Sequence, residues 1–158
     1  MTKILESKIR VRFQDCDPFN HLNNSSYIDY FFDAREDQLH KYYDLDIYKH
    51  ARETGKGWVV VTNQISYMKP ALLSETVTVQ SQVINYTKRS IQFEFHMFDE
   101  TKKVLKAVMW SKFVYFDIRS QKGATHSQDF MKLFEEISLP IEAKTFDERI
   151  ANILKGKL

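Results

Sequence analysis

The residues best suited to chemistry lie together in one short segment near the N-terminus. Asp15, Cys16, Asp17 and His21 all fall within the segment DCDPFNHLNN. A helix is predicted to begin directly after it, and the free N–H groups and dipole of a helix N-terminus favour negative charge. A carboxylate beside such donors can serve as a base or nucleophile while the donors stabilise an oxyanion. The alternative is that Asp15 and Asp17 only cap turns or the helix.

Other chemistries fit this segment less well. A cysteine hydrolase would need the thiolate of Cys16, which the flanking carboxylates disfavour. A calcium loop beginning at Asp15 would have Phe19 and Ser26 where oxygen ligands are required. A magnesium-dependent phosphatase of the Asp-x-Asp type needs strands and helices that alternate in a parallel sheet. Ligand-type residues close in sequence often bind no metal, so no metal site is predicted.

The elements flanking the segment follow from hydrophobic periodicity. Ile9, Val11 and Phe13 alternate with basic residues, which predicts a half-buried strand. From Tyr27 onward, apolar residues recur at three- and four-residue steps, which predicts an amphipathic helix continuing toward His50. The helix start is indicated by four N-cap residues in a row, positions 23 to 26. Ser26 and Asp29 are spaced as a capping box.

The rest of the chain predicts a sheet followed by two short helices. Four further strands are expected near residues 58–68, 77–83, 91–97 and 104–116, joined by turns that imply antiparallel pairing. Helices are expected at 129–137 and 146–154. The fold class is therefore α+β, with a five-stranded antiparallel sheet and one long helix. The expected organisation is one domain over residues 1–126 and a C-terminal helical extension, 127–158, packed on it.

Composition narrows the class of protein. The 158 residues carry a net charge of +2 with basic and acidic residues interspersed, which argues against nucleic acid as a partner. The single Cys16 fits a reducing compartment, and no apolar run suits a signal peptide or a membrane span, so a cytoplasmic location is expected. The aromatic share of 14% suggests that a second subunit buries one sheet face. A homodimer or homotetramer is therefore expected.

The segment VRFQDCDPFNHLNNSSYIDYFFDARE resembles the signature of hotdog thioesterases of the 4-hydroxybenzoyl-CoA thioesterase type. That signature is an Asp-x-Asp-x-x-Gly-His-x-Asn-Asn loop followed by an aromatic-rich helix ending in Ala-Arg. The element order is similar from Lys8 to Asp117, and the residues from Tyr67 to Ala71, followed by Glu75, are similar to the family's strand connection. The resemblance implies a hotdog fold, in which the antiparallel sheet wraps around the long central helix.

One position departs from the family's motif. Asn20 stands where the family has Gly. If the backbone there requires a positive φ, Asn is the least costly replacement after Gly. The loop shape is therefore expected to survive.

The resemblance also implies roles for individual residues. Asp17 matches the catalytic carboxylate, which is a nucleophile or a general base depending on the family member. His21 and Asn23 match polar positions that shape the loop and position water, and Asn24 falls where a backbone N–H polarises the thioester carbonyl. A substrate-binding role is expected for Asn23 and for Tyr27, the first aromatic residue of the helix. The same role is expected for Lys88, Arg89 and Ser90, in the turn that meets the CoA phosphates in relatives.

The function expected from the resemblance is hydrolysis of an acyl-CoA to a free acid and CoA, at sites between subunits of an oligomer. No cofactor is expected, since CoA is part of the substrate. The alternatives are a non-catalytic module that binds acyl-CoA or acyl-carrier protein, and a hotdog dehydratase. The loop order favours the thioesterase.

Overall fold

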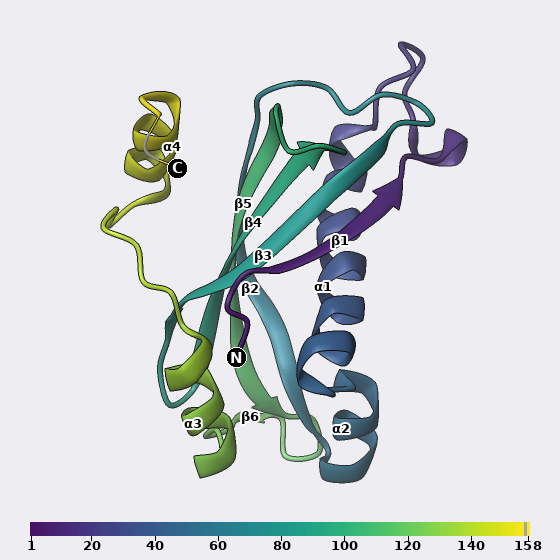
Figure 1. Ribbon diagram of the computed structural model, residues 1–158. Helices are drawn as coiled ribbons and strands as arrows, with labels where there is room; N and C mark the ends of the chain where they lie inside the picture. The colour runs from purple at the N-terminus through teal and green to yellow at the C-terminus, as the bar shows by residue number, and fades with distance from the viewer. Residues whose placement is uncertain (157) are drawn as a thin grey trace.

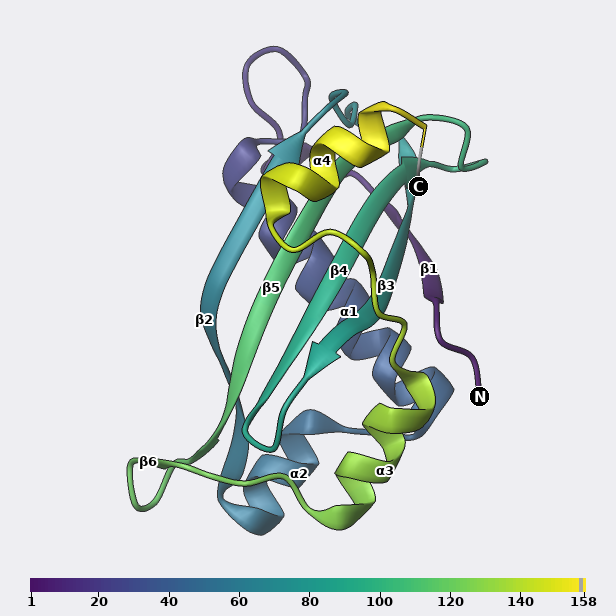
Figure 2. The ribbon, with the colours of Figure 1, turned by 90° about the vertical axis from the view of Figure 1, so that its left-hand side faces the viewer.

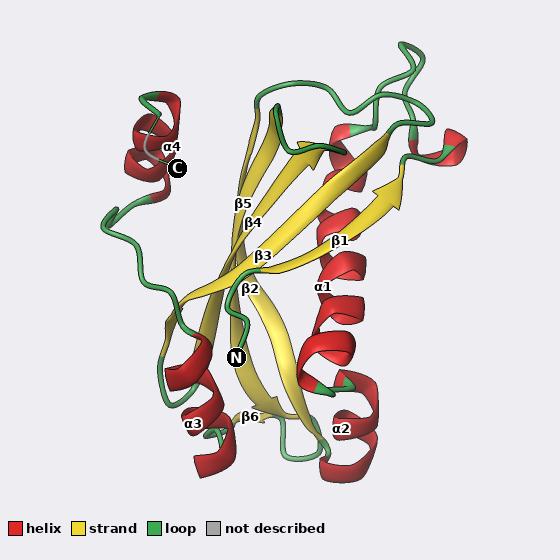
Figure 3. Ribbon diagram, viewed as in Figure 1, coloured by secondary structure: helices red, strands yellow, loops and turns green. Residues whose placement is uncertain are grey.

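The computed structural model describes residues 1–156 and 158 as one antiparallel sheet with helices on both sides (Figures 1 and 3). The strand order is β1-β3-β4-β5-β2, and a short β6 pairs with β5. The predicted α+β class is confirmed, with β6 as an addition that the sequence did not indicate. The strands are β1 (Leu5–Arg10), β2 (Lys56–Tyr67), β3 (Thr76–Tyr86), β4 (Ser90–Asp99), β5 (Leu105–Asp117) and β6 (Lys122–Gly123).

The long helix α1 (Tyr27–Tyr43) lies along one face of the sheet (Figure 1). Phe31 on its inner side is fully buried and lies 5.4 Å from Phe95 of β4, measured between ring centroids. The alternating residues of β4 and β5 that face α1, such as Met97 and Met109, are likewise fully buried. The three-to-four-residue apolar spacing of α1 and the period of two in the strands thus meet in one core.

The first strand ends earlier than the sequence pattern predicts. Phe13 was expected to face the core, but it lies in a 3-10 turn, Phe13–Asp15, and its side chain is 81% exposed. The pairing of β1 with β3 ends where Arg10 meets Thr76, and Val11 makes one more backbone hydrogen bond, to Glu75. Beyond the start of β3 there is no strand for the chain to pair with. The position of Phe13 in the alternating pattern therefore does not make it part of the strand.

The predicted helix toward His50 is in fact two helices. α1 ends at Tyr43, where Asp44 adopts the left-handed conformation with φ 51°, and α2 (Ile47–Thr54) begins after Asp46. The Asp46 side chain accepts hydrogen bonds from two backbone N–H groups of α2, so it starts a new helix. The expected Ser26–Asp29 capping box is wrong as well, because the side chain that caps this N-terminus belongs to Asn23.

The C-terminal helices change the argument about the second sheet face. α3 (Gln128–Ile137) places Phe134 and Ile137 in the main core, and α4 (Phe146–Leu154) lies across the outer face of the sheet (Figure 2). Phe146 of α4 packs against Trp110 of β5, with ring centroids 5.6 Å apart. The chain's own α4 therefore covers apolar surface that the composition had suggested a second subunit would bury.

A buried ion pair fastens α4 to the sheet. Glu94 of β4 has a side chain that is 0% exposed, and both nitrogens of an Arg149 fork reach its two oxygens, at 2.8 and 2.7 Å. His96 and Trp110 donate further hydrogen bonds to the same carboxylate, at 2.7 and 2.8 Å.

Of the helices within the described residues, none is long and apolar enough to cross a membrane.

Candidate active site

The loop between β1 and α1 folds around the side chain of Asp17. Asp17 Oδ1 accepts hydrogen bonds from the backbone N–H groups of Phe19, at 2.9 Å, and His21, at 3.1 Å. The Asp17 N–H in turn donates to the His21 carbonyl at 2.8 Å. Asp17 therefore caps the turn, as expected if its role were only structural, but it does so with Oδ1 alone. No described residue donates a hydrogen bond to Oδ2, which leaves that oxygen available.

The turn at Asn20 has the backbone conformation that the motif's glycine requires. Asn20 adopts a φ of 62°, and its N–H donates to the Asp17 carbonyl at 3.1 Å. The left-handed region is open to Gly and tolerated by Asn, so the loop keeps its shape without Gly. The expectation for this position is confirmed.

A pair of substitutions tests the strain at Asn20. Asn20→Ala should lower the free energy of unfolding by about 1 kcal/mol, because a Cβ without a compensating polar group disfavours the left-handed conformation. Asn20→Gly should stay within about 0.5 kcal/mol of the wild type. Urea denaturation measures both values. Equal stability of the Ala and Gly variants would contradict the assignment of strain.

Asp17 opens onto a surface pocket of about 300 Å³ that also contains other predicted site residues. His21, Asn24 and Tyr27 line it, together with residues of the connection from β2 to β3. The imidazole of His21 forms no hydrogen bond with a described residue, so it is free to meet a ligand. Tyr27 is only 2% exposed, and its hydroxyl accepts the Ala71 N–H at 3.1 Å, so it contributes a small part of the wall.

The helix N-terminus supplies a backbone donor at this pocket. A 3-10 turn, Asn24–Ser26, leads directly into α1, so the first free N–H of the combined helix is that of Asn24. No described residue accepts a hydrogen bond from it. Asn23, for which the resemblance implies loop shaping and water positioning, accepts hydrogen bonds at Oδ1 from the N–H and hydroxyl of Ser25, at 3.1 and 3.0 Å. Asn23 does not line the pocket.

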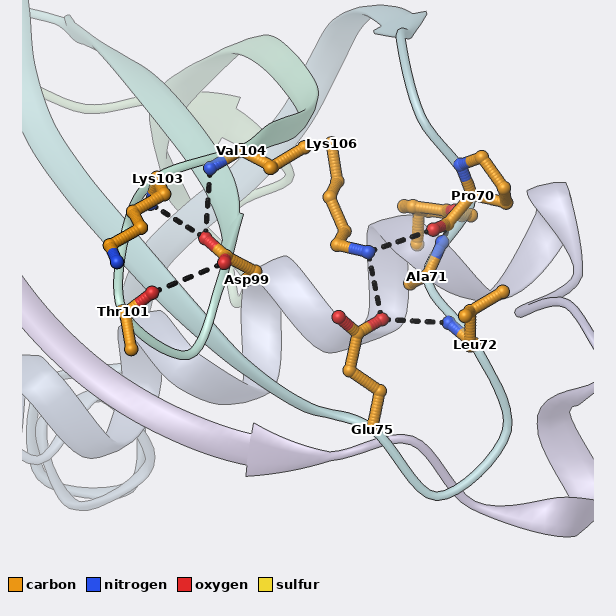
Figure 4. A network of polar contacts seen from close by, with 10 residues as sticks. Pro70, Ala71, Leu72, Glu75, Asp99, Thr101, Lys103, Val104 and Lys106 are labelled. Carbon is orange, nitrogen blue, oxygen red and sulfur yellow. Dashed lines mark hydrogen bonds and ion pairs between the residues drawn. The ribbon is translucent and has the colours of Figure 1, made fainter.

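The second wall of the pocket comes from the connection between β2 and β3. Lys106 of β5 donates to the Pro70 carbonyl at 3.0 Å and to Glu75 Oε1 at 2.9 Å, and the same Glu75 oxygen accepts the Leu72 N–H (Figure 4). Lys106 is 7% exposed, so this ion pair is shielded from solvent. It ties the connection to β5, while backbone hydrogen bonds such as that from the Leu22 N–H to the Ala71 carbonyl, at 2.8 Å, join the connection to the Asp17 loop. The residues of the connection that line the pocket are Tyr67, Met68, Lys69 and Pro70. The sequence indicated that this connection is similar to the family's but did not predict that it forms part of the site.

The neighbouring Asp15 and Cys16 have other environments. Asp15 Oδ2 accepts the Tyr30 hydroxyl at 2.6 Å, so this carboxylate ties the loop to α1. Burial, followed by the charges of Asp17 and Asp15, raises the pKa of the Cys16 thiol, which agrees with a thiol that is not activated. Among the described residues, no three His, Cys, Asp or Glu side chains are grouped as metal ligands.

The predicted phosphate-binding turn lies at the other end of the sheet. Lys88 and Arg89 belong to the turn between β3 and β4 and Ser90 begins β4, whereas the Asp17 loop lies beside the start of β3 (Figure 1). β3 spans 11 residues, which places the two sites about 30 Å apart in one chain. The side chains of Lys88 and Arg89 are exposed, while Ser90 Oγ bonds to Thr87 Oγ1 at 2.8 Å. Within one chain these residues do not reach the Asp17 pocket.

Comparison with known proteins identifies the family. The model of the thioesterase-like superfamily matches residues 11–140, which include the Asp17 loop, α1 and the strands β2 to β6 but none of β1. The chain belongs to the thioesterase-like superfamily. A curated relative, the long-chain acyl-CoA thioesterase FadM of Escherichia coli, is 26% identical over 133 residues, covering 84% of this chain and 98% of FadM.

Solved structures of thioesterases share the fold. The probable thioesterase YbaW of Escherichia coli superposes with a TM-score of 0.72 at 25% identity, covering 85% of this chain and 99% of YbaW. A protein of Staphylococcus aureus solved in complex with CoA gives 0.79 at 13% identity, covering 92% of each chain. The predicted hotdog fold and thioesterase family are therefore confirmed.

Proposed function

We propose that this member of the thioesterase-like superfamily hydrolyses acyl-CoA thioesters to a free acid and CoA, with Asp17 as the catalytic carboxylate. The observation that carries the proposal is the pairing of two unused groups in one pocket. Asp17 Oδ2 accepts no hydrogen bond and the Asn24 N–H donates none, among the described residues, and both residues line the same 300 Å³ pocket. A thioester hydrolase needs one group of each kind.

The reaction can be written with these groups alone. Asp17 takes a proton from water, the water oxygen attacks the thioester carbonyl carbon, and the carbonyl oxygen accepts a hydrogen bond from the Asn24 N–H as it gains negative charge. The C–S bond then breaks, and the CoA thiolate leaves and takes up a proton. Acting instead as nucleophile, Asp17 would form an acyl anhydride that water then cleaves. Finding ¹⁸O in Asp17 after a single turnover in H₂¹⁸O would establish the nucleophile route, because only water attack on the Asp17 carbonyl of the anhydride places it there.

The names of the relatives support the substrate class. FadM is named as a long-chain acyl-CoA thioesterase, and the Staphylococcus aureus structure contains CoA. Release of free thiol from a series of acyl-CoAs of increasing chain length tests the proposal. A protein that binds acyl-CoA without releasing thiol would be the non-catalytic binding module instead. Cytoplasmic acyl-CoA is the proposed source, in keeping with the single Cys16.

We further propose that two chains pair through β2. This strand is 12 residues long, lies at the sheet edge, and exposes Val59, Val60 and Val61 by 41, 42 and 52%. A long apolar edge of this kind is a template for pairing with another strand. Antiparallel pairing about a two-fold axis near Thr62 would set the Tyr67 end of β2 beside the Trp58 end of the partner's strand.

Such a dimer would bring the distant turn to the pocket. Trp58 pairs with Tyr115 of β5, and the Tyr115 N–H donates to the Arg89 carbonyl at 2.8 Å. The Trp58 end of β2 and the turn with Lys88 and Arg89 therefore lie at the same end of the molecule. In the proposed dimer that end of one chain faces the Asp17 pocket of the other, which supports the predicted contact with CoA phosphates.

The β2 pairing predicts a dimer that an edge charge disrupts. Light scattering of the wild type should give twice 18.8 kDa, and Val61→Lys should weaken the dimer at least tenfold because it places a charge on the pairing edge. Val104→Lys is the matched control, since Val104 is 41% exposed in the turn before β5, away from this edge. A wild-type monomer with full activity would refute the pairing.

The phosphate-binding turn predicts a change in KM alone. Replacing Lys88 and Arg89 with Ala should raise KM for acyl-CoA several-fold with little change in kcat, because the phosphates do not change during hydrolysis. Added salt should have the same effect on the wild type by screening. An acyl-pantetheine thioester, which lacks the nucleotide, should not respond to the double substitution. Equal KM values at low salt would show that the turn is only solvated.

A further inference from the structure

A second site is indicated by Arg35, a buried cation without a counter-charge. Arg35 lies on the sheet side of α1 and is 7% exposed, yet no described residue forms an ion pair or hydrogen bond with its guanidinium. Its Nε is fully buried and has no partner. The guanidinium carbon lies 4.3 Å from the ring centroid of Phe113 and 4.8 Å from that of Phe93. Cation–π contacts are thus its only described polar interactions.

This arrangement is costly, and a ligand could complete it only at the terminal nitrogens of Arg35, since Nε is closed off from solvent and ligand alike. Burial lowers the pKa of Arg35 to about 10, so the group remains charged at neutral pH. Aromatic contacts offset only part of the cost of removing a cation from water. The adjacent acid, Glu36, accepts the Tyr48 hydroxyl at 2.7 Å and forms no ion pair with Arg35, although its charge counteracts part of the effect of burial on the Arg35 pKa. A buried polar group left without a partner calls for an explanation beyond packing.

Arg35 borders a cavity of about 160 Å³ between α2 and the start of β2. Its other walls are mostly apolar and include Ile47, Ala51, Trp58 and Val59. A smaller and almost wholly apolar hollow of about 30 Å³ shares Arg35, Ile47 and Trp58 with this cavity as lining residues. The cavity differs from the Asp17 pocket, because Tyr27 of that pocket lies eight residues, about 12 Å, from Arg35 along α1.

We propose that the cavity at Arg35 binds the carboxylate of a small organic acid with an apolar body. The guanidinium offers the donors and charge that a carboxylate prefers, and the apolar walls offer space for a hydrocarbon chain or ring. A dianionic phosphate is a poorer fit, because the cavity contains one cation and few polar groups. The carboxylate can belong to a free acid or be the distal carboxylate of a dicarboxylic acyl thioester. Only the second source rests on the proposed hydrolysis.

Binding of matched acids and amides tests the site directly. Benzoate and hexanoate should raise the Tm of the wild type by roughly 5 °C at a hundredfold excess over Kd. Benzamide and hexanamide have the same shape without the charge and should bind at least tenfold more weakly. Arg35→Met should lose at least tenfold in acid affinity, while Arg52→Met, the same change at an exposed position, should lose none.

Several outcomes would overturn the proposal. Equal binding of acid and amide would make the cavity a general apolar pocket, and this comparison needs only the wild type if Arg35→Met does not fold. Unchanged acid binding by a folded Arg35→Met would place the acid elsewhere. Absence of acid binding, with a weakened dimer in Arg35→Met, would show that a second copy of the chain supplies the missing carboxylate.

The two sources of the carboxylate are separated by kinetics. If the acyl group supplies it, the wild type should prefer dicarboxylic thioesters to monocarboxylic ones of equal length at least tenfold in kcat/KM, and Arg35→Met should lose that preference. If a free acid supplies it, Arg35→Met should leave the ratio unchanged while losing acid binding. A wild type that hydrolyses no thioester but binds the acids would refute the proposed function and leave this site standing.

Discussion

Asp17→Asn is expected to lower kcat for acyl-CoA hydrolysis by about 10²–10⁴-fold, the usual contribution of a general base. The variant should remain folded, because the Asn side-chain oxygen can still accept the Phe19 and His21 N–H groups that Asp17 Oδ1 accepts. What is lost is the charge and basicity of the second oxygen. Thiol release under saturating substrate gives kcat, and urea denaturation checks that stability is retained.

Cys16→Ser provides the matched control for this experiment. It alters the residue directly before Asp17, whose thiol donates only a weak hydrogen bond to the Arg12 carbonyl at 3.4 Å. Its kcat should match that of the wild type. An Asp17→Asn variant within threefold of wild-type activity would remove Asp17 from the mechanism, and a loss beyond about tenfold in Cys16→Ser would restore the thiol as a candidate nucleophile.

Arg149→Met should destabilise the protein by about 3–5 kcal/mol, the usual effect of removing one partner from a buried ion pair. Glu94 would remain fully buried and lose both hydrogen bonds from the Arg149 fork. Urea denaturation measures the change. The double variant with Glu94→Gln should recover part of the loss, because no unpaired buried charge remains. A loss below about 1 kcal/mol in Arg149→Met would show that α4 is held by its apolar contacts alone.

The buried carboxylate of Glu94 predicts how the free energy of unfolding depends on pH at the acid end. Burial alone would raise the pKa of Glu94, but hydrogen bonds from His96, Arg149 and Trp110 and the charge of His96 outweigh it and lower the pKa to about 2. Since the folded-state value lies below the ordinary 4.5, the stabilisation is complete above pH 4.5 and is lost as pH falls toward 2. The loss is about 3 kcal/mol at most. The Glu94→Gln variant should lack this pH-dependent part of the free energy of unfolding.

The sequence was informative where the relevant residues are close along the chain. Asp17, His21 and Asn24 lie within one loop, and their shared pocket follows from the helix that begins after it. β1, β3 and β4 were predicted from their period of two, and β2 from its content of Val, Ile and Tyr. The prediction of one helix toward His50 was wrong because the left-handed residue Asp44 ends α1, while the apolar spacing in the sequence continues past it.

The sequence was uninformative where distant residues meet. Glu94 and Arg149 are 55 positions apart, and each resembles an ordinary surface charge when read alone. Arg35 was noted only as the end of the family's motif, since neither its burial nor its lack of a partner can be seen without the rings of Phe93 and Phe113. The turn with Lys88 and Arg89 lies outside the pocket of its own chain, because the length of β3 separates them.

The position of α4 also restricts how copies of this chain can assemble. Sheets that stack face to face lie about 10 Å apart, which is about the width of one helix with its side chains. α4 already fills that layer over β4 and β5 (Figure 2) and is anchored there by Arg149. Back-to-back stacking of two such sheets would require α4 to leave first. Growth beyond a pair of chains must therefore use the helical side of the molecule or the β1 edge of the sheet rather than this outer face.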